Sequence, residues 1–377
     1  MIFDKAHFSE DIIDIPKETG LHIILTTDED DIRPVYISGN FNNWLTQDKE
    51  FVMERMGIGL YHYKFASDFK LPETVLYKFT KGDWSAVEID VNGEKTENRS
   101  TTKHSGVQKE HVFRWRKNWL PFKSNFLPQI QLISDEFEIP QLKTTRKVWA
   151  LLPHDYDSST ESYPVMYLQD AQNLFNENAE YGNWEIDKKL AVMSEYQVGK
   201  IIVIAVEHAE EDRLKEYNVG KTVLGKGKGK KYIDFLVETL KPYVDSNYRT
   251  KPERKFTGIG GSSMGALVSI FSGLKYPEVF GKLMIFSPSL WVDPKMKIKN
   301  HEGSEDTKIY LYAGGDESET MIEHVQAFKK KILKNEFVDD KMKINLSINK
   351  LGKHNETYWS DEFPKAIEWL FFNSKDN

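Results

Sequence analysis

Hydrophobic and polar positions follow one pattern up to about Trp115 and another from about Pro128 onward. In the first part, short segments rich in β-branched and aromatic residues are separated by turn signals such as Gly39-Asn40, without helical periodicity. This spacing predicts a small antiparallel β-sandwich of immunoglobulin-like type over residues 16–115. Its predicted strands are residues 21–25, 35–38, 60–65, 75–79 and 86–91.

In the second part, apolar runs with no polar face alternate with segments of helical spacing. Strands buried on both faces and alternating with helices predict the α/β class, with a mainly parallel sheet covered by helices on each side. The predicted domain is residues 128–377, and residues 116–127, which lack a clear period, form the predicted linker. Two antiparallel strands at 131–137 and 146–152 come first, followed by strands at 165–168, 201–206, 256–259, 283–286, 309–312 and 344–348. The predicted helices are residues 184–196, 230–243, 264–275, 319–334 and 364–371.

One stretch carries candidate chemistry: Gly261-Ser262-Ser263-Met264-Gly265 has the form G-x-S-x-G. A predicted strand precedes it and a predicted helix follows it, which is the context of a nucleophile elbow. The turn is tight, so the residues two before and two after the serine must be very small. We therefore predict that Ser263 is a nucleophile and that the N–H of Met264 faces a developing oxyanion.

An activated serine needs a base and an orienting acid, and in α/β-hydrolases they follow the serine in the order acid, then histidine. His324 lies within a predicted helix, whereas His354 follows a strand, at the end where open α/β sheets place their sites. His354 is therefore the predicted base. The segment after strand 309–312 offers Asp316, Glu317 and Glu319, and spacing alone does not choose among these three carboxylates.

Stretches across the second part resemble the esterase D-like family of α/β-hydrolases, which includes enterobactin, feruloyl and acetyl-xylan esterases. These stretches are residues 163–175, Arg213 with Glu216-Tyr217, 234–250, 261–265, Tyr276-Pro277, Ser287-Pro288-Ser289 and His354-Asn355 with Trp359.

The resemblance implies specific roles. It implies Glu317 as the acid, with Asp316 second. It also implies an oxyanion hole built from the N–H of Met264 and that of Ala171 or Gln172. Many relatives carry His-Gly or Asp-Gly where this chain has Asp170-Ala171, which leaves the donor open.

Further polar and aromatic residues follow predicted strand ends or lie near them, and are expected to line a substrate pocket. They are Trp184, Arg213, Glu216 and His208. The alternative for Arg213 and Glu216 is a purely structural ion pair.

The first part resembles starch-binding carbohydrate-binding modules in residues 35–44, 77–84 and 97–99. The resemblance implies that Trp44 and Trp84 stack on sugar rings and bind a glucan-type ligand. Alternatively, the sandwich has lost sugar binding and both tryptophans belong to a core or an interface.

Composition narrows the functional classes. The chain has 51 Lys and Arg against 58 Asp and Glu, a formal charge of −7, so neither nucleic acid nor a membrane is an expected partner. Cysteine is absent and no H-E-x-x-H pattern occurs, so no metal and no cofactor are expected. Acidic residues in the first eleven positions argue against a signal peptide and favour a cytoplasmic protein; a removed leader would allow a periplasmic or secreted one.

Together these features favour a serine carboxylic ester hydrolase acting through an acyl-enzyme. The favoured substrate is a small-molecule or oligosaccharide ester, carbohydrate-linked and of acetyl or feruloyl type. A cytoplasmic siderophore esterase of enterobactin-like type is the alternative within enzymes. A non-catalytic glycan-binding protein is the alternative of another class.

Overall fold

The computed structural model describes residues 20–30, 32–90, 93–116, 122–176, 179, 182–294, 296, 307–333 and 342–372. The chain divides into two compact units, Met1–Leu120 and Pro121–Asn377. Parts of the sequence predictions lie outside the described residues, namely 16–19, 91, 117–121, 334 and 373–377.

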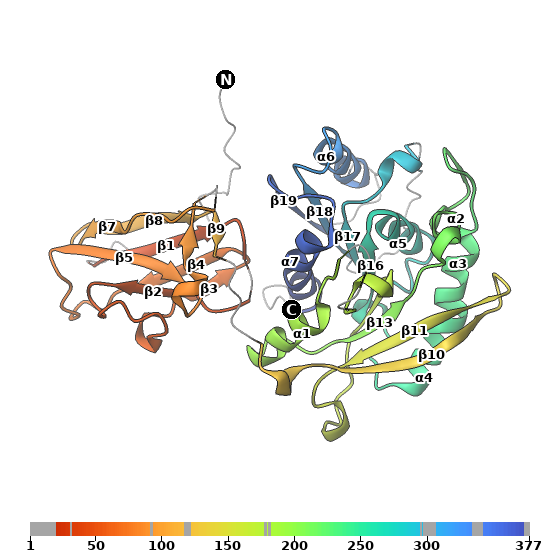
Figure 1. Ribbon diagram of the computed structural model, residues 1–377, viewed down its shortest axis with the longest axis horizontal. Helices are drawn as coiled ribbons and strands as arrows, with labels where there is room; N and C mark the ends of the chain where they lie inside the picture. The colour runs from red at the N-terminus through yellow and green to blue at the C-terminus, as the bar shows by residue number, and fades with distance from the viewer. Residues whose placement is uncertain are drawn as a thin grey trace. The chain divides into compact units, whose positions relative to one another are not determined.

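Unit 2 is built on one eight-stranded sheet in the order β10-β11-β13-β12-β16-β17-β18-β19 (Figure 1). The pairs β10–β11 and β11–β13 are antiparallel, and all the others are parallel, as the sequence predicted. The strands are β10 (Gln129–Ile139), β11 (Thr144–Leu152), β12 (Val165–Gln169), β13 (Ile202–Val206), β16 (Thr257–Ser262), β17 (Lys282–Phe286), β18 (Thr307–Gly314) and β19 (Met342–Asn349). A two-stranded ribbon of β14 (Lys221–Thr222) and β15 (Gly225–Lys226) lies apart from this sheet.

Helices cover both faces of the sheet, and together with the strand order and the antiparallel β11 this gives unit 2 an α/β-hydrolase fold. In Figure 1, α1 and α7 lie together on one face, while α5 packs on the other face with α2 and α3 beside it. The helices are α1 (Ile186–Glu195), α2 (Arg213–Tyr217), α3 (Gly229–Phe235), α4 (Lys241–Asn247), α5 (Ser263–Lys275), α6 (Met321–Leu333) and α7 (Glu356–Ile367). Between α3 and α4 the helix continues through a π-helical turn, Leu236–Leu240.

Helix α7 differs most from its prediction, because it begins at Glu356 and not at Pro364. Asn355 caps it by accepting a hydrogen bond from the N–H of Tyr358 at 3.4 Å. Pro364 lies inside the helix, although proline favours a helix start. The earlier start places the first turn of α7 directly after His354.

Unit 1 contains two main sheets, of order β3-β4-β1-β8 and β2-β5-β7, and a short pair β6-β9. Alternate residues of β1 and β5, such as Ile23, Leu25, Val75 and Tyr77, meet in one buried core, as expected for a sandwich. The strands are β1 (His22–Thr27), β2 (Tyr36–Gly39), β3 (Glu54–Gly57), β4 (Leu60–Lys64), β5 (Thr74–Thr80), β6 (Glu88–Ile89), β7 (Arg99–Thr102), β8 (Val107–Val112) and β9 (Arg114–Trp115).

The expectation of a wholly antiparallel sandwich is wrong in one place, because β1 and β8 run parallel. Strands β3, β7, β8 and β9 were not predicted. Strand β8, with the sequence VQKEHV, shows why: it is mostly polar and half-buried, so it lacks the hydrophobic alternation on which prediction depends.

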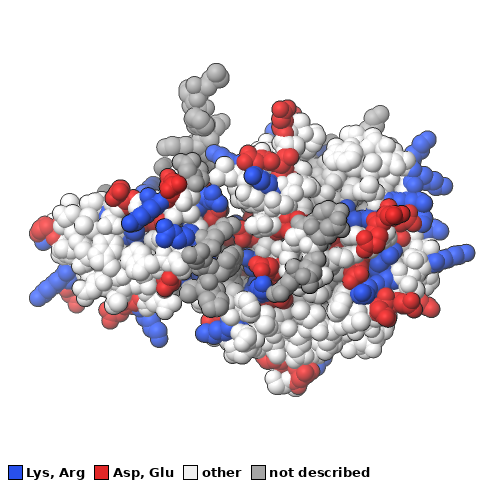
Figure 2. All heavy atoms as spheres, viewed as in Figure 1, with Lys and Arg blue, Asp and Glu red and all other residues white. Residues whose placement is uncertain are grey.

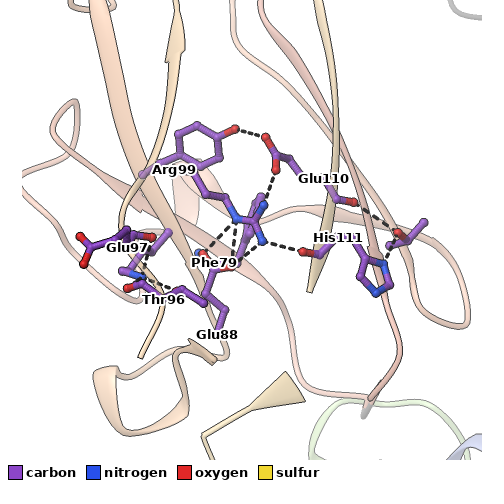
Figure 3. Close-up of polar contacts among 10 residues, drawn as sticks. Phe79, Glu88, Thr96, Glu97, Arg99, Glu110 and His111 are labelled. Carbon is purple, nitrogen blue, oxygen red and sulfur yellow. Dashed lines mark hydrogen bonds and ion pairs between the residues drawn. The ribbon is translucent and has the colours of Figure 1, made fainter. Parts of the chain in front are cut away.

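A polar network around Arg99 joins the strands of unit 1 (Figure 3). Its guanidinium donates to Glu88 Oε2 at 2.7 Å, to the carbonyl of His111 at 2.6 Å and to the carboxylate of Glu110. The ring of Phe79 lies 5.2 Å from the guanidinium carbon. Because the Glu88 side chain is only 1% exposed, its charge depends on this partner.

Arg99→Met is therefore expected to lower the free energy of unfolding of unit 1 by about 3–5 kcal/mol, since it leaves a buried carboxylate unpaired. Lys103→Met is the matched control, because it removes an ion pair with the exposed Glu73 and leaves stability nearly unchanged. Urea unfolding of the full chain, followed by hydrogen exchange in peptides from residues 74–112, measures both. Equal losses in the two variants would contradict the structural role of Arg99.

Charged residues of both signs are mixed over the face of the molecule drawn in Figure 2. Within the described residues no helix is long and apolar enough to cross a membrane.

Candidate active site

Ser263 lies at the sharp turn between β16 and α5, with a φ of 55°, which is left-handed for a residue with a side chain. The two flanking glycines are required by close packing. A Cβ at Gly261 would lie 3.1 Å from the carbonyl carbon of Gly265, and one at Gly265 would lie 2.9 Å from Asp170 Oδ2. The local geometry is thus the strained strand–turn–helix that exposes a serine hydroxyl at the end of a sheet.

The other polar groups of the site follow the next strands in order. Ser287 comes directly after β17, Glu317 follows β18, and His354 follows β19, so with Ser263 after β16 the residues lie at the ends of four adjacent parallel strands. Carboxyl ends of parallel strands share one edge of the sheet, which is where open α/β folds bind their ligands.

His354 is paired with Glu317. Its Nδ1 lies 2.7 Å from Glu317 Oε2, and the Glu317 side chain is 1% exposed against 38% for His354. The other carboxylate oxygen accepts from the N–H of Gly314 and the hydroxyl of Ser287, both at 2.6 Å. Asp316 is exposed, and its side chain makes no such contact with another residue that the structure describes. The structure therefore brings His354 together with Glu317 and not with Asp316.

Trp359 on α7 supports both members of this pair. Its indole N–H donates to Ser287 Oγ at 2.9 Å, and Ser287 in turn donates to Glu317. Its ring meets that of His354 edge to face, with centroids 4.9 Å apart and an interplanar angle of 84°. Neither Trp359 nor Ser287 has a role predicted from the sequence; the signal in the sequence is a tryptophan one helical turn after the Asn355 cap.

The hydroxyl of Ser263 lies 3.2 Å from that of Ser289, whose N–H donates to the carbonyl of Ser263 at 3.1 Å. Within the described residues Ser263 makes no hydrogen bond to His354. Bonds of this kind are often long without substrate and tighten in the substrate complex.

The loop after β12 lies against the elbow. Asp170, at a left-handed φ of 62°, accepts from Arg213 Nε at 2.7 Å and from Nη2 at 2.8 Å. Burial would lower the pKa of Arg213, but the Asp170 charge outweighs burial and raises it. The expected alternative, an Arg213–Glu216 ion pair, is wrong: Glu216 pairs with Arg146 at 2.7 Å, and burial raises its pKa.

The side chain of Gln172 ties this loop to the loop after β13. Its Nε2 donates to the carbonyl of His208 at 3.2 Å, and its Oε1 accepts from the N–H of His208 at 3.0 Å. Ala171 is buried, at 2% exposure. The backbone of residues 171–172 is thus fixed from two sides, by the Arg213–Asp170 pair and by the Gln172–His208 pair.

Two of the expected pocket residues are buried. Trp184 is 2% exposed and packs on Phe286 and Trp359, with ring centroids 5.5 and 6.0 Å away, so its faces are covered. Glu216 is 3% exposed and is used by Arg146. Arg213 and His208 stay beside the loop after β12. Glu356, at the start of α7, accepts from Asn173 Nδ2 at 3.3 Å, and burial raises its pKa.

In unit 1, Trp44 and Trp84 lie together, with ring centroids 6.2 Å apart and an interplanar angle of 42°. They border a hollow of about 360 Å³, and Trp84 is 41% exposed. Among the described residues of the chain, no group of three or more His, Asp or Glu side chains is arranged to hold a metal ion.

A model of the esterase family described as "Putative esterase" matches residues 139–370, more than half of the chain. The chain belongs to this family. It is therefore a carboxylic ester hydrolase, which confirms the esterase resemblance noted in the sequence.

Individual relatives of this esterase are distant. The uncharacterized protein YbbA of Bacillus subtilis is 24% identical over 243 residues, 60% of this chain and 92% of YbbA. An IroE-like serine hydrolase from Shewanella oneidensis has a TM-score of 0.52 at 19% identity, covering 65% of this chain and 80% of that one. The enterobactin esterase FES of Shigella flexneri, in the presence of 2,3-di-hydroxy-N-benzoyl-serine, has a TM-score of 0.51 at 14% identity, covering 93% and 92%. At such identities the two structures show a shared fold.

Proposed function

We propose that this esterase works through an acyl-enzyme formed on Ser263, with His354 as general base and Glu317 as the acid that orients it. The observation that carries the proposal is the placement of Ser263, Glu317 and His354 at the ends of neighbouring strands, with Ser263 in a strained elbow. The Glu317–His354 hydrogen bond fixes which ring nitrogen carries the proton, so that Nε2 is free to accept one.

The reaction then proceeds in two halves. The Ser263 hydroxyl turns from Ser289 toward His354, loses its proton to Nε2 and attacks the ester carbonyl carbon. The N–H groups of Met264 and of Ala171 or Gln172 stabilise the oxyanion, each contributing about 3 kcal/mol. Collapse breaks the C–O bond, and His354 returns the proton to the leaving alcohol. Water, deprotonated by His354, releases the acid by the same steps.

The Arg213–Asp170 pair is expected to matter for rate because it holds the loop that supplies an oxyanion donor. Arg213→Gln should lower kcat by about 10- to 100-fold, since small displacements of a catalytic donor cost this much. Arg146→Gln is the matched control: it also removes a buried pair, with Glu216, but one outside this loop. Steady-state kinetics with p-nitrophenyl acetate measures kcat for both variants. Equal losses of kcat would refute a specific role of the Arg213–Asp170 pair in positioning the loop after β12.

Trp359→Phe keeps an aromatic ring against His354 but removes the N–H that holds Ser287. Losing one neutral hydrogen bond costs about 1 kcal/mol, so kcat should fall about fivefold with KM unchanged. Trp369→Phe is the control, because that indole packs on Tyr310. A change in KM alone would show that Trp359 touches substrate and does not position the Glu317–His354 pair.

The favoured substrate is an ester borne on a carbohydrate, because unit 1 presents two tryptophans at a hollow. Indole faces suit the C–H faces of sugar rings, and aromatic-lined concave sites are common ligand sites. We therefore propose that Trp44 and Trp84 bind sugar. A second candidate, a siderophore esterase, is favoured by the enterobactin esterase FES, whose similarity extends over 93% of this chain.

Relative kcat/KM values separate the two candidates. Acetylated and feruloylated xylo-oligosaccharides are to be compared with the cyclic triester of 2,3-dihydroxybenzoyl-serine. If the substrate is a carbohydrate ester, we expect kcat/KM for the sugar esters to exceed that for the triester by about 100-fold or more, because the site would form hydrogen bonds with the sugar. Preference for the triester would establish the siderophore alternative.

A further inference from the structure

The hollow of unit 1 is notable for its charge. Besides the indoles of Trp44 and Trp84, it is lined by three cations, one amide and one apolar side chain: Lys78, Lys95, Arg116, Asn98 and Val87. None of its described lining residues is acidic. Glu94 and Glu97 are neighbours of Lys95 in sequence, but neither lines the hollow.

One of these cations is committed to structure. Lys78 is 5% exposed, and its Nζ donates to the carbonyl of Thr96 at 2.7 Å, to Thr96 Oγ1 at 2.6 Å and to the carbonyl of Glu97 at 3.1 Å. Burial is the main cause that lowers its pKa; the charges of Arg99 and Lys95 act in the same direction, and those of Glu88 and Glu97 act in the opposite one. Lys78 thus fixes the backbone segment that carries Lys95 and Asn98.

The other two cations, Lys95 and Arg116, have no structural partner among the described residues. Lys95 and Arg116 are exposed, and neither side chain makes an ion pair or hydrogen bond with another described residue. Two unpaired cations beside a third repel one another, and this repulsion is relieved when an anion binds. A neutral glucan would stack on the two indole rings but would leave the charges of Lys95 and Arg116 without an anionic partner.

We propose that this hollow binds an anionic oligosaccharide, one whose sugar rings carry phosphate or carboxylate groups. The indoles of Trp44 and Trp84 stack on the faces of the sugar rings, and Asn98 forms a hydrogen bond with a sugar hydroxyl. Lys95 and Arg116 bind the anionic group through charge-assisted hydrogen bonds. The inference rests on the proposed sugar site and adds the charge of its ligand.

The test measures affinity of the full chain by gel electrophoresis in three polysaccharides: neutral amylopectin, 6-phosphorylated amylopectin and polygalacturonate. We expect at least one anionic polymer to bind about tenfold more tightly than neutral amylopectin at low ionic strength, with the excess lost in high salt. The two anionic polymers distinguish phosphate from carboxylate.

Variants of the lining residues test the roles of charge and stacking. Lys95→Gln with Arg116→Gln should remove the tighter binding of the anionic polymers and keep binding of neutral amylopectin, whereas Trp84→Ala should weaken binding of all three. Lys103→Gln, a surface lysine outside the hollow, is the control.

The remaining outcomes of this test overturn either the anionic ligand alone or the sugar site as a whole. Equal binding of neutral and anionic polymers, or an excess that survives the double substitution, overturns the anionic ligand and leaves the sugar site intact. Binding of none of the three by a folded protein overturns both. Neither outcome affects the proposed ester cleavage by unit 2, because hydrolysis of p-nitrophenyl acetate is measured separately.

Discussion

Ser263→Ala is expected to lower kcat for p-nitrophenyl acetate by about 10⁴-fold or more, with the fold intact. In the proposed mechanism no acyl-enzyme can form without this hydroxyl, and only the binding and oxyanion contributions remain. Alanine fits the site, because the left-handed backbone at this position already holds a Cβ.

Ser289→Ala is the matched control, since its hydroxyl lies 3.2 Å from that of Ser263 in the same small site. Removing this neutral hydrogen bond should change kcat by about fivefold at most. A collapse of activity in Ser289→Ala, with Ser263→Ala still active, would show that the wrong serine has been assigned.

Glu317→Gln is expected to have the next largest effect, a loss of about 10³- to 10⁴-fold in kcat. The amide keeps the shape of the carboxylate but loses its charge, so it neither stabilises the imidazolium of His354 nor enforces the required tautomer. The three polar contacts of Glu317, with Ser287, Gly314 and His354, hold this side chain in place, so the substitution changes its charge more than its position.

Asp316→Asn provides the comparison, because Asp316 is the adjacent acid and is exposed. Its charge acts on His354 only through water and salt, so kcat should stay within about twofold of wild type. Near-equal losses of kcat in the two variants would contradict the assignment of Glu317. They would indicate that the combined negative charge of the loop acts on His354.

The sequence predicted the features that depend on local chemistry. The elbow could be predicted because a Cβ at position 261 or 265 would crowd its neighbours, and the acid–histidine order together with the helical placement of His324 left His354 as the predicted base. The parallel strands of unit 2 were readable because they are buried on both faces and therefore apolar throughout.

The remaining features depend on contacts between distant segments. Arg213 follows β13 and its partner Asp170 follows β12, whereas the ion pair considered from the sequence joined Arg213 to its near neighbour Glu216. The Trp359–Ser287–Glu317 chain of hydrogen bonds joins helix α7 to the ends of β17 and β18 across 72 residues of sequence, and no local pattern encodes it. In unit 1 the polar strands β7 and β8 are stabilised by the Arg99 network and not by hydrophobic alternation.

The most direct test of the central claim is covalent labelling with a fluorophosphonate, followed by tryptic digestion and mass spectrometry. We expect one adduct, on Ser263 in the peptide of residues 256–275, which is absent in Ser263→Ala and accompanied by loss of esterase activity. Ser289 lies in a different tryptic peptide, residues 283–295, so the two serines are distinguished directly. A folded protein that takes no label, or takes it on Ser289, would contradict the assignment of Ser263 as the nucleophile.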